Sequence, residues 1–195
     1  EETALRNKGR QHIAGVDEAG KGSWAGPIVA GAVILPPDFK PSIINDSKKL
    51  TPKQREKMFV HIARNAVAWA VAVIPAETID RIGIKKANIM ALEQAVKKLH
   101  IAPHAVLVDA VKIKVGRKPV KAIIDGDAIV LTIAAASIVA KVVRDTLMDG
   151  EHRLYPQYDF RRHKGYGTAK HAQLLKRYGL SPIHRRSFKP MRDLR

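Results

Sequence analysis

The chain has 195 residues, enough for one domain with a full core, and its apolar runs fall short of the ~20 residues that a membrane helix needs. It has no cysteine, which excludes disulfides and thiolate metal sites and fits the reducing cytoplasm, where we expect the protein to act. Its 35 lysines and arginines against 18 acids make the net charge +17, which favours a nucleic-acid partner. The alternatives are a basic protein adapted to heat or salt and a passive ribosomal-type protein.

The first part of the chain predicts an antiparallel β-hairpin. Residues 1–11 are polar and basic and predict a frayed start. The apolar runs 13–16 and 25–35 predict two strands, and the glycine-rich segment between them predicts the turn. Asp17 and Glu18 end the first run. Because successive strand side chains point to opposite faces, these two acids serve one site only if the strand ends or bends there.

The turn Gly20-Lys21-Gly22 is suited to binding an anion or a sugar. Its glycines let backbone amides approach a ligand closely, and Lys21 adds a positive charge. The alternative is an ordinary polar turn that only ends a strand.

Strands and helices alternate along the middle of the chain. Residues 51–64 begin with a capping box and predict a helix, 66–74 predict a strand, and 85–100 carry apolar residues at helical spacing. Residues 105–108 and 121–124 predict two short buried strands. An initial hairpin followed by such alternation predicts a mixed sheet with helices packed on it, an α/β fold.

The last third of the chain is helical and basic. Residues 131–148 predict an alanine-rich helix, on which Ser137, Lys141 and Arg144 form one polar stripe. A hydroxyl beside two cations suits phosphate contacts better than the alternative of a solvated face.

The segment from residue 161 to 168 has the composition of a nucleic-acid surface. His163 and three other basic residues precede Tyr166, which stands between two glycines. An exposed ring beside cations is typical of stacking on nucleic acid. Thr168 predicts the cap of a helix through Tyr178, and the basic tail 182–195 predicts irregular structure.

Carboxylates end several of the predicted strands, where they would repel one another unless a cation holds them. A hard divalent ion, Mg²⁺ or Mn²⁺, fits, and two such ions ~3.5–4 Å apart would serve phosphodiester hydrolysis. Histidine-based zinc chemistry fits poorly, since the eight histidines lack metal-ligand spacing. The acids at strand ends are Asp17, Glu18, Asp109 and Asp127.

Several motifs together resemble type 2 ribonuclease H, in its bacterial form ribonuclease HII. The resemblance covers the chain from about residue 12 to the end. The motifs, in chain order, are DEAGKG (17–22), AGPIVAGAVIL (25–35), DSKKL (46–50), VDA (108–110), GDA (126–128), AAASIVAKV (134–142), RD (144–145), HKGYGT (163–168) and SPIHR (181–185).

The resemblance implies one catalytic domain over residues 11–195, with a five-stranded mixed sheet flanked by helices and a C-terminal helical extension that binds substrate from about residue 150. It also implies that the four acids named above are the catalytic and metal-binding residues. The sequence context favours Asp127 over Asp125 as the fourth acid. The implied substrate contacts are Gly20, Lys21, Gly22, Lys48, Ser137, Lys141, Arg144, His163 and Tyr166.

The implied activity is a monomeric endoribonuclease that uses Mn²⁺ or Mg²⁺. It would cleave the RNA strand of RNA–DNA hybrids and nick DNA duplexes 5′ of single ribonucleotides, leaving 5′-phosphate and 3′-hydroxyl ends. Two departures stand out, since Lys21 replaces the family's usual arginine and Trp24 replaces a smaller residue. A partner such as a replication clamp leaves no visible motif.

Two alternatives remain open from the sequence. One is a non-catalytic basic protein that binds structured nucleic acid, whose acids are only surface carboxylates. The other is the sister type 3 ribonuclease H, against which the lysine between the glycines and the missing N-terminal domain both count.

Overall fold

The computed structural model describes residues 1–40 and 50–194 and has a five-stranded sheet at its centre, in the order β3-β2-β1-β4-β5. β1 pairs antiparallel with β2 and parallel with β4, β2 pairs antiparallel with β3, and β4 pairs parallel with β5. The expected hairpin and mixed sheet are therefore confirmed. The strands are β1 (Ile13–Ala19), β2 (Ile28–Ile34), β3 (Ala68–Ile74), β4 (Ala105–Asp109) and β5 (Val120–Ile123).

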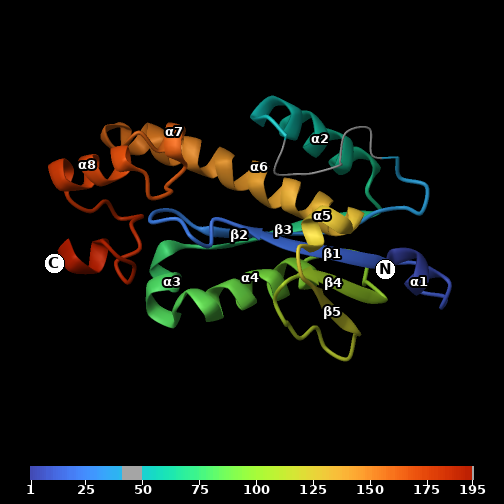
Figure 1. The fold of residues 1–195 in the computed structure, drawn as a ribbon. Helices are drawn as coiled ribbons and strands as arrows, with labels where there is room; N and C mark the ends of the chain where they lie inside the picture. Colours follow the sequence, from blue (N-terminus) through green and yellow to red (C-terminus); the bar gives the residue numbers. More distant parts are fainter. Residues whose placement is uncertain (41–49, 195) are drawn as a thin grey trace.

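Helices cover both faces of this sheet (Figure 1). α6 (Leu131–Leu154) and α2 (Pro52–Asn65) lie on one face, while α3 (Ala76–Ile82) and α4 (Ile84–Lys97) lie on the other. None of the helices that the structure describes is long and apolar enough to span a bilayer. The remaining helices are α1 (Glu2–Arg6), α5 (Gly126–Ile129), α7 (Phe160–His163), α8 (Ala169–Tyr178) and the 3₁₀ helices η2 (Pro156–Tyr158) and η3 (Met191–Leu194).

α6 lies directly on the backbone of the two central strands. A Cβ atom at Gly15 of β1 would stand 2.1 Å from the Thr132 carbonyl carbon, and one at Gly31 of β2 would stand 2.5 Å from the Ala136 carbonyl oxygen. Only glycine permits this approach, and the alanine-rich sequence of α6 supplies the matching small side chains. The contact brings Ser137, in the next turn of α6, to the end of β1.

The structure corrects several expected elements. Residues 2–6 form a helix, although the polar start predicts fraying. α6 continues to Leu154, six residues beyond its expected end. On β3 the alanine face is buried, whereas Trp69 and Val71, on the other face, are half buried against the α2–α6 layer. On α2, Met58 and Ile62 are buried, whereas Phe59 is half buried.

The C-terminal segment is more ordered than its composition predicts. α7, α8 and the tail gather beyond the end of α6 (Figure 1). The expected helix cap is confirmed, since the Thr168 hydroxyl accepts a hydrogen bond from the His171 amide. The tail returns to the loop between β1 and β2, where His184 pairs with Ala25 in an isolated β-bridge. It also contacts α3, where Asp80 accepts hydrogen bonds from the Arg186 and Ser187 amides.

Candidate active site

The first two acids lie at the end of β1 and face opposite layers. Asp17 is on the α6 side, where its carboxylate is hydrogen-bonded to Ser137. Glu18 is on the α4 side and accepts a hydrogen bond of 3.1 Å from the Asn88 amide nitrogen. The strand continues regularly to Ala19 and ends at Gly20, whose φ of +87° turns the chain away. The turn therefore comes after both acids. Glu18 nevertheless lines the same pocket as the turn, and its carboxylate lies 3.3 Å from the Lys21 ammonium.

The surroundings of Asp17 destabilise its ionised carboxylate. It is 6% exposed. Burial, then the charge of Glu18 and to a smaller extent that of Asp109, raise the pKa of Asp17 from 3.8 to about 7, against the opposing hydrogen bonds from Ser137 and from the Glu18 amide. A buried carboxylate beside two others is stabilised by any cation that neutralises the cluster.

The third and fourth acids come from the neighbouring part of the sheet. Asp109 ends β4, which runs parallel to β1, so its carboxylate lies at the same sheet edge as Asp17. It accepts a hydrogen bond of 2.8 Å from the Gly126 amide at the start of α5. Asp127, the next residue of α5, is 4% exposed, whereas Asp125 is exposed and lies in the left-handed region. The structure thus brings Asp127, rather than Asp125, into the interior beside this edge.

The donor set suits a hard cation that is also bound by substrate. In the described part of the chain, no group of three or more histidines and acids is already close enough to hold a metal ion. Mg²⁺ typically takes only one or two carboxylates and keeps water or phosphate oxygens in its other positions. Repelling carboxylates at the ends of adjacent strands fit that mode of binding.

An open pocket of about 430 Å³ lies beside Glu18. Most of its lining residues were expected from the sequence, and Arg55 of α2 was not. Arg55 is one of several charged residues on α2, with Lys53, Glu56 and Lys57 beside it, so no sequence signal distinguishes it from a solvated face. The lining residues are Glu18, Ala19, Gly20, Lys21, Gly22, Arg55, Ser137, Ile138, Lys141 and Tyr166.

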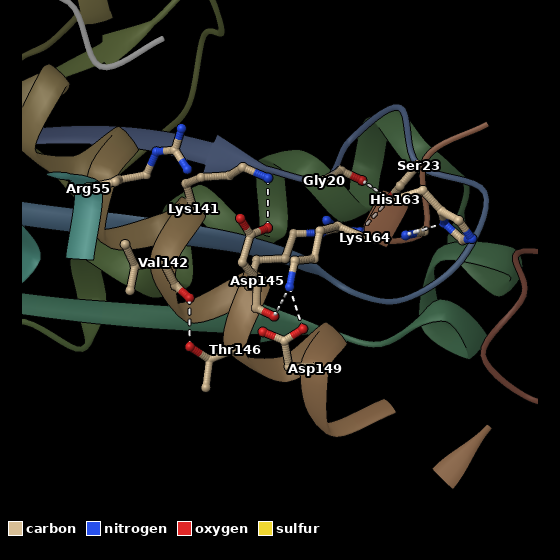
Figure 2. A network of polar contacts seen from close by, with 12 residues as sticks. Gly20, Ser23, Arg55, Lys141, Val142, Asp145, Thr146, Asp149, His163 and Lys164 are labelled. Carbon is tan, nitrogen blue, oxygen red and sulfur yellow. Dashed lines mark hydrogen bonds and ion pairs between the residues drawn. The ribbon is translucent and has the colours of Figure 1, made fainter. Parts of the chain in front are cut away.

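Two aspartates on α6 hold the cations beside this pocket (Figure 2). Lys141 is paired with Asp145 at 2.7 Å, and its ammonium lies 5.4 Å from the centre of the Tyr166 ring. Lys164 pairs with Asp149 and also donates to the Asp145 carbonyl. Figure 2 shows Arg55 on the same side as Lys141. These pairs orient the basic wall of the pocket.

Two of the expected substrate contacts are corrected by the structure. Arg144 is fully buried, and its guanidinium donates to the Pro27 and Ala25 carbonyls and to Ser23, so it does not belong to an exposed phosphate-binding stripe. His163 is also buried and holds the chain around Tyr166 instead of facing solvent. The expected contact Lys48 lies outside the described residues.

Three histidines next to Tyr166, His163, His171 and His184, contact one another through hydrogen bonds and ring stacking. Nδ1 of His171 donates to the Tyr166 carbonyl at 2.9 Å, because that oxygen can only accept. Nε2 of His171 must then accept from Nε2 of His184 at 3.0 Å, while Nδ1 of His184 accepts from the Ser181 amide at 2.9 Å. His163 stacks on His171 with ring centres 4.2 Å apart. The pattern requires neutral rings, and burial accordingly lowers the pKa of His171 to about 4 and that of His184 to about 3.

Trp24, whose role the sequence leaves open, packs inside this C-terminal group. Its ring lies 5.4 Å from that of His171, and a Cβ atom at Gly167 would stand 2.2 Å from it. Gly167 is therefore required for space. Trp24 fixes the segment that follows Tyr166 and does not line the pocket.

Comparison with known proteins gives a consistent picture. The profile of the family described as Ribonuclease HII matches residues 14–191. Ribonuclease HII of Desulfitobacterium hafniense is 49% identical over 99% of this chain and 74% of its own. The crystal structure of ribonuclease H2 from Pyrococcus horikoshii is 27% identical, with a TM-score of 0.79 over 94% of this chain and 96% of its own. Bst-RNase HIII in complex with Mn²⁺ shares the fold at 19% identity, with a TM-score of 0.74 over 95% of this chain and 69% of its own.

Proposed function

Because this chain belongs to the ribonuclease HII family and is thus a ribonuclease H endonuclease, we propose that it hydrolyses the RNA strand of RNA–DNA hybrids and nicks duplex DNA 5′ of single ribonucleotides. The observation that carries the proposal is the placement of Asp17 and Asp109 at the ends of adjacent parallel strands, beside a pocket lined by a glycine turn and Tyr166. In this proposal the acids that bind metal, the glycine turn that contacts the sugar and the Tyr166 ring that stacks on it all lie at the same edge of the sheet.

Each wall of the pocket has a separate task in this proposal. The 2′-hydroxyl distinguishes the target sugar, and the backbone of the glycine turn is close enough to a ligand to bind it. The Tyr166 ring stacks on the following sugar. Lys21, Lys141 and Arg55 contact phosphates on either side of the cleaved bond, and Lys21 does so as a point charge, without the planar fork of an arginine.

Asp17, Glu18, Asp109 and Asp127 would hold the divalent ions, Mn²⁺ or Mg²⁺. When bound, two such ions supply an activated water and stabilise the leaving 3′-oxygen. The chain itself keeps Asp17 oriented through Ser137 and the Glu18 amide, and keeps Asp109 oriented through the Gly126 amide. These hydrogen bonds fix where the carboxylate oxygens point before the substrate arrives.

The family match and the 49% identity to a named ribonuclease HII answer both alternatives left open by the sequence. The chain belongs to an enzyme family, and the family that it matches is ribonuclease HII.

The test is cleavage of a labelled DNA duplex that carries one ribonucleotide, with a uniform RNA–DNA hybrid and an all-DNA duplex in parallel. We expect Mg²⁺- or Mn²⁺-dependent cleavage of the first two, with a single nick 5′ of the ribonucleotide and a 3′-hydroxyl that a polymerase can extend. Cleavage of the hybrid alone would remove the nicking activity from the proposal. Cleavage that persists in EDTA would remove the metal-dependent mechanism.

A further inference from the structure

Two buried arginines hold the loop that contains the glycine turn. Arg185, from the C-terminal tail, is fully buried. Its guanidinium donates to the Gly20 carbonyl at 2.7 Å, to the Lys21 carbonyl at 2.8 Å and to the Gly26 carbonyl at 3.0 Å. Arg144 binds the rest of the loop from α6, at the Ala25 and Pro27 carbonyls. Two guanidinium groups therefore bind five carbonyls of residues 20–27.

These hydrogen bonds determine which way the turn presents its amides. In a planar trans peptide the carbonyl and the following N–H point in opposite directions. Because the carbonyls of Gly20 and Lys21 point at Arg185, the N–H groups of Lys21 and Gly22 point away from it. Gly20, Lys21 and Gly22 line the pocket on their other side. The turn therefore directs its donors outward, with two buried positive charges behind them.

The fit between the turn and the arginines is close. Gly20 has a φ of +87°, and a Cβ atom there would stand 1.8 Å from Nε of Arg144. The Ser23 hydroxyl links the turn to Arg144, since it donates to the Gly20 carbonyl and accepts from the Arg144 guanidinium, both at 2.7 Å. An arginine has a rigid fork of five donors that can bind three carbonyls at once, whereas a lysine ammonium is a single point.

We propose that Arg185 is a positioning residue for ribonucleotide recognition, which holds the Gly20 and Lys21 carbonyls inward so that the Lys21 and Gly22 amides face the 2′-oxygen of the substrate. Arg185 itself touches no substrate. The proposal rests on the function proposed above, and it adds the tail residue that sets the geometry of the turn.

The experiment measures discrimination, which a purely structural role would not change. Affinities for a duplex with one ribonucleotide and for the same duplex in all-DNA form are measured by fluorescence anisotropy in EDTA, and kcat and KM for nicking are measured in Mg²⁺. In Arg185→Lys we expect the ratio of the two affinities to fall by about five- to tenfold, the loss of one or two hydrogen bonds, with little change in the affinity for all-DNA duplex. The matched control is Arg186→Lys at the exposed neighbouring position, which should keep the ratio.

A separate control tests whether a loss of stability by itself changes the ratio of the two affinities. Leu92→Ala removes a buried side chain from the α4 layer, away from the turn, and should lower the melting temperature without changing the ratio. Should Arg185→Lys not fold, Ser23→Ala loosens the same turn more mildly and should lower the ratio too. A folded Arg185→Lys with lower melting temperature and an unchanged ratio would overturn the proposal and leave Arg185 as an anchor of the tail. A wild-type protein that neither prefers nor nicks the ribonucleotide duplex would overturn the proposed function instead.

Discussion

At the scale of single residues, Asp17 connects stability to catalysis. Its pKa is raised from 3.8 to about 7, so the ionised form is disfavoured in the folded protein. The resulting penalty is absent below pH 3.8, grows as the pH rises and is complete above pH 7. At about 1.4 kcal/mol for each pH unit in that window, it amounts to at most about 4 kcal/mol without a cation.

We therefore expect Asp17→Asn to be more stable than the wild type at pH 8 in EDTA and equally stable near pH 4, as measured by urea unfolding at both pH values. Added Mn²⁺ should stabilise the wild type much more than the variant, and the variant should lose nicking. The control is Asp125→Asn, which removes the same charge at an exposed position. Divalent-dependent nicking by Asp17→Asn would contradict the assignment of Asp17 as a metal ligand.

Tyr166 tests the stacking contact at the same scale. Its ring lines the pocket, and the guanidinium carbon of Arg144 lies 5.1 Å from the ring centre. Stacking needs the ring and not the phenol oxygen, so Tyr166→Phe should keep most of the nicking activity. Tyr166→Ala should lose about 1–3 kcal/mol of transition-state stabilisation on the single-ribonucleotide duplex and less on a uniform hybrid. Equal losses on both substrates, in kcat/KM, would mean that the ring only positions the backbone.

At the scale of elements, the histidine chain attaches α8 and the tail to Tyr166. Burial lowers the pKa values of His171 and His184 to about 4 and 3. A histidine that is neutral in the folded state and protonates near pH 6.5 when unfolded contributes stability that is complete above pH 6.5 and declines as the pH falls toward the folded pKa.

We expect the melting temperature of the wild type to fall from pH 6.5 to pH 4. His184→Gln should be less stable than the wild type at pH 7.5, by about 1–3 kcal/mol, because the chain of hydrogen bonds is broken. On acidification the variant should lose less stability than the wild type does. His100→Gln, at an exposed position after α4, should follow the wild-type curve. If His184→Gln lost as much stability on acidification as the wild type, the histidine chain would not be the source of the acid sensitivity.

At the scale of the whole molecule, the net charge of +17 governs binding to any duplex. Each phosphate neutralised by the protein lowers the slope of log affinity against log salt by about 0.9. We expect a steep slope for the RNA–DNA hybrid when its affinity is measured by fluorescence anisotropy at salt concentrations from about 50 to about 200 mM. Lys21→Gln in the pocket should reduce the magnitude of the slope by about 0.9, the contribution of one phosphate contact. Lys98→Gln, at the C-terminal end of α4, should leave the slope unchanged. A flat slope would favour contacts other than phosphate.

The sequence by itself determined the α/β class, the hairpin, most helix and strand positions and the family, because these depend on hydrophobic period, capping residues and contiguous motifs. It also identified most residues that line the pocket, from Glu18 to Tyr166. Only the tertiary structure decided which polar side chains are exposed. Arg144 and His163 look like surface residues in their local sequence, yet both are buried, since the loop before β2 packs on Arg144 and His171 of α8 stacks on His163. The placement of Arg55 and the three carbonyl contacts of Arg185 likewise depend on segments far apart in the chain. Local sequence sets the shape of each element, whereas burial and donor direction follow from what packs against it.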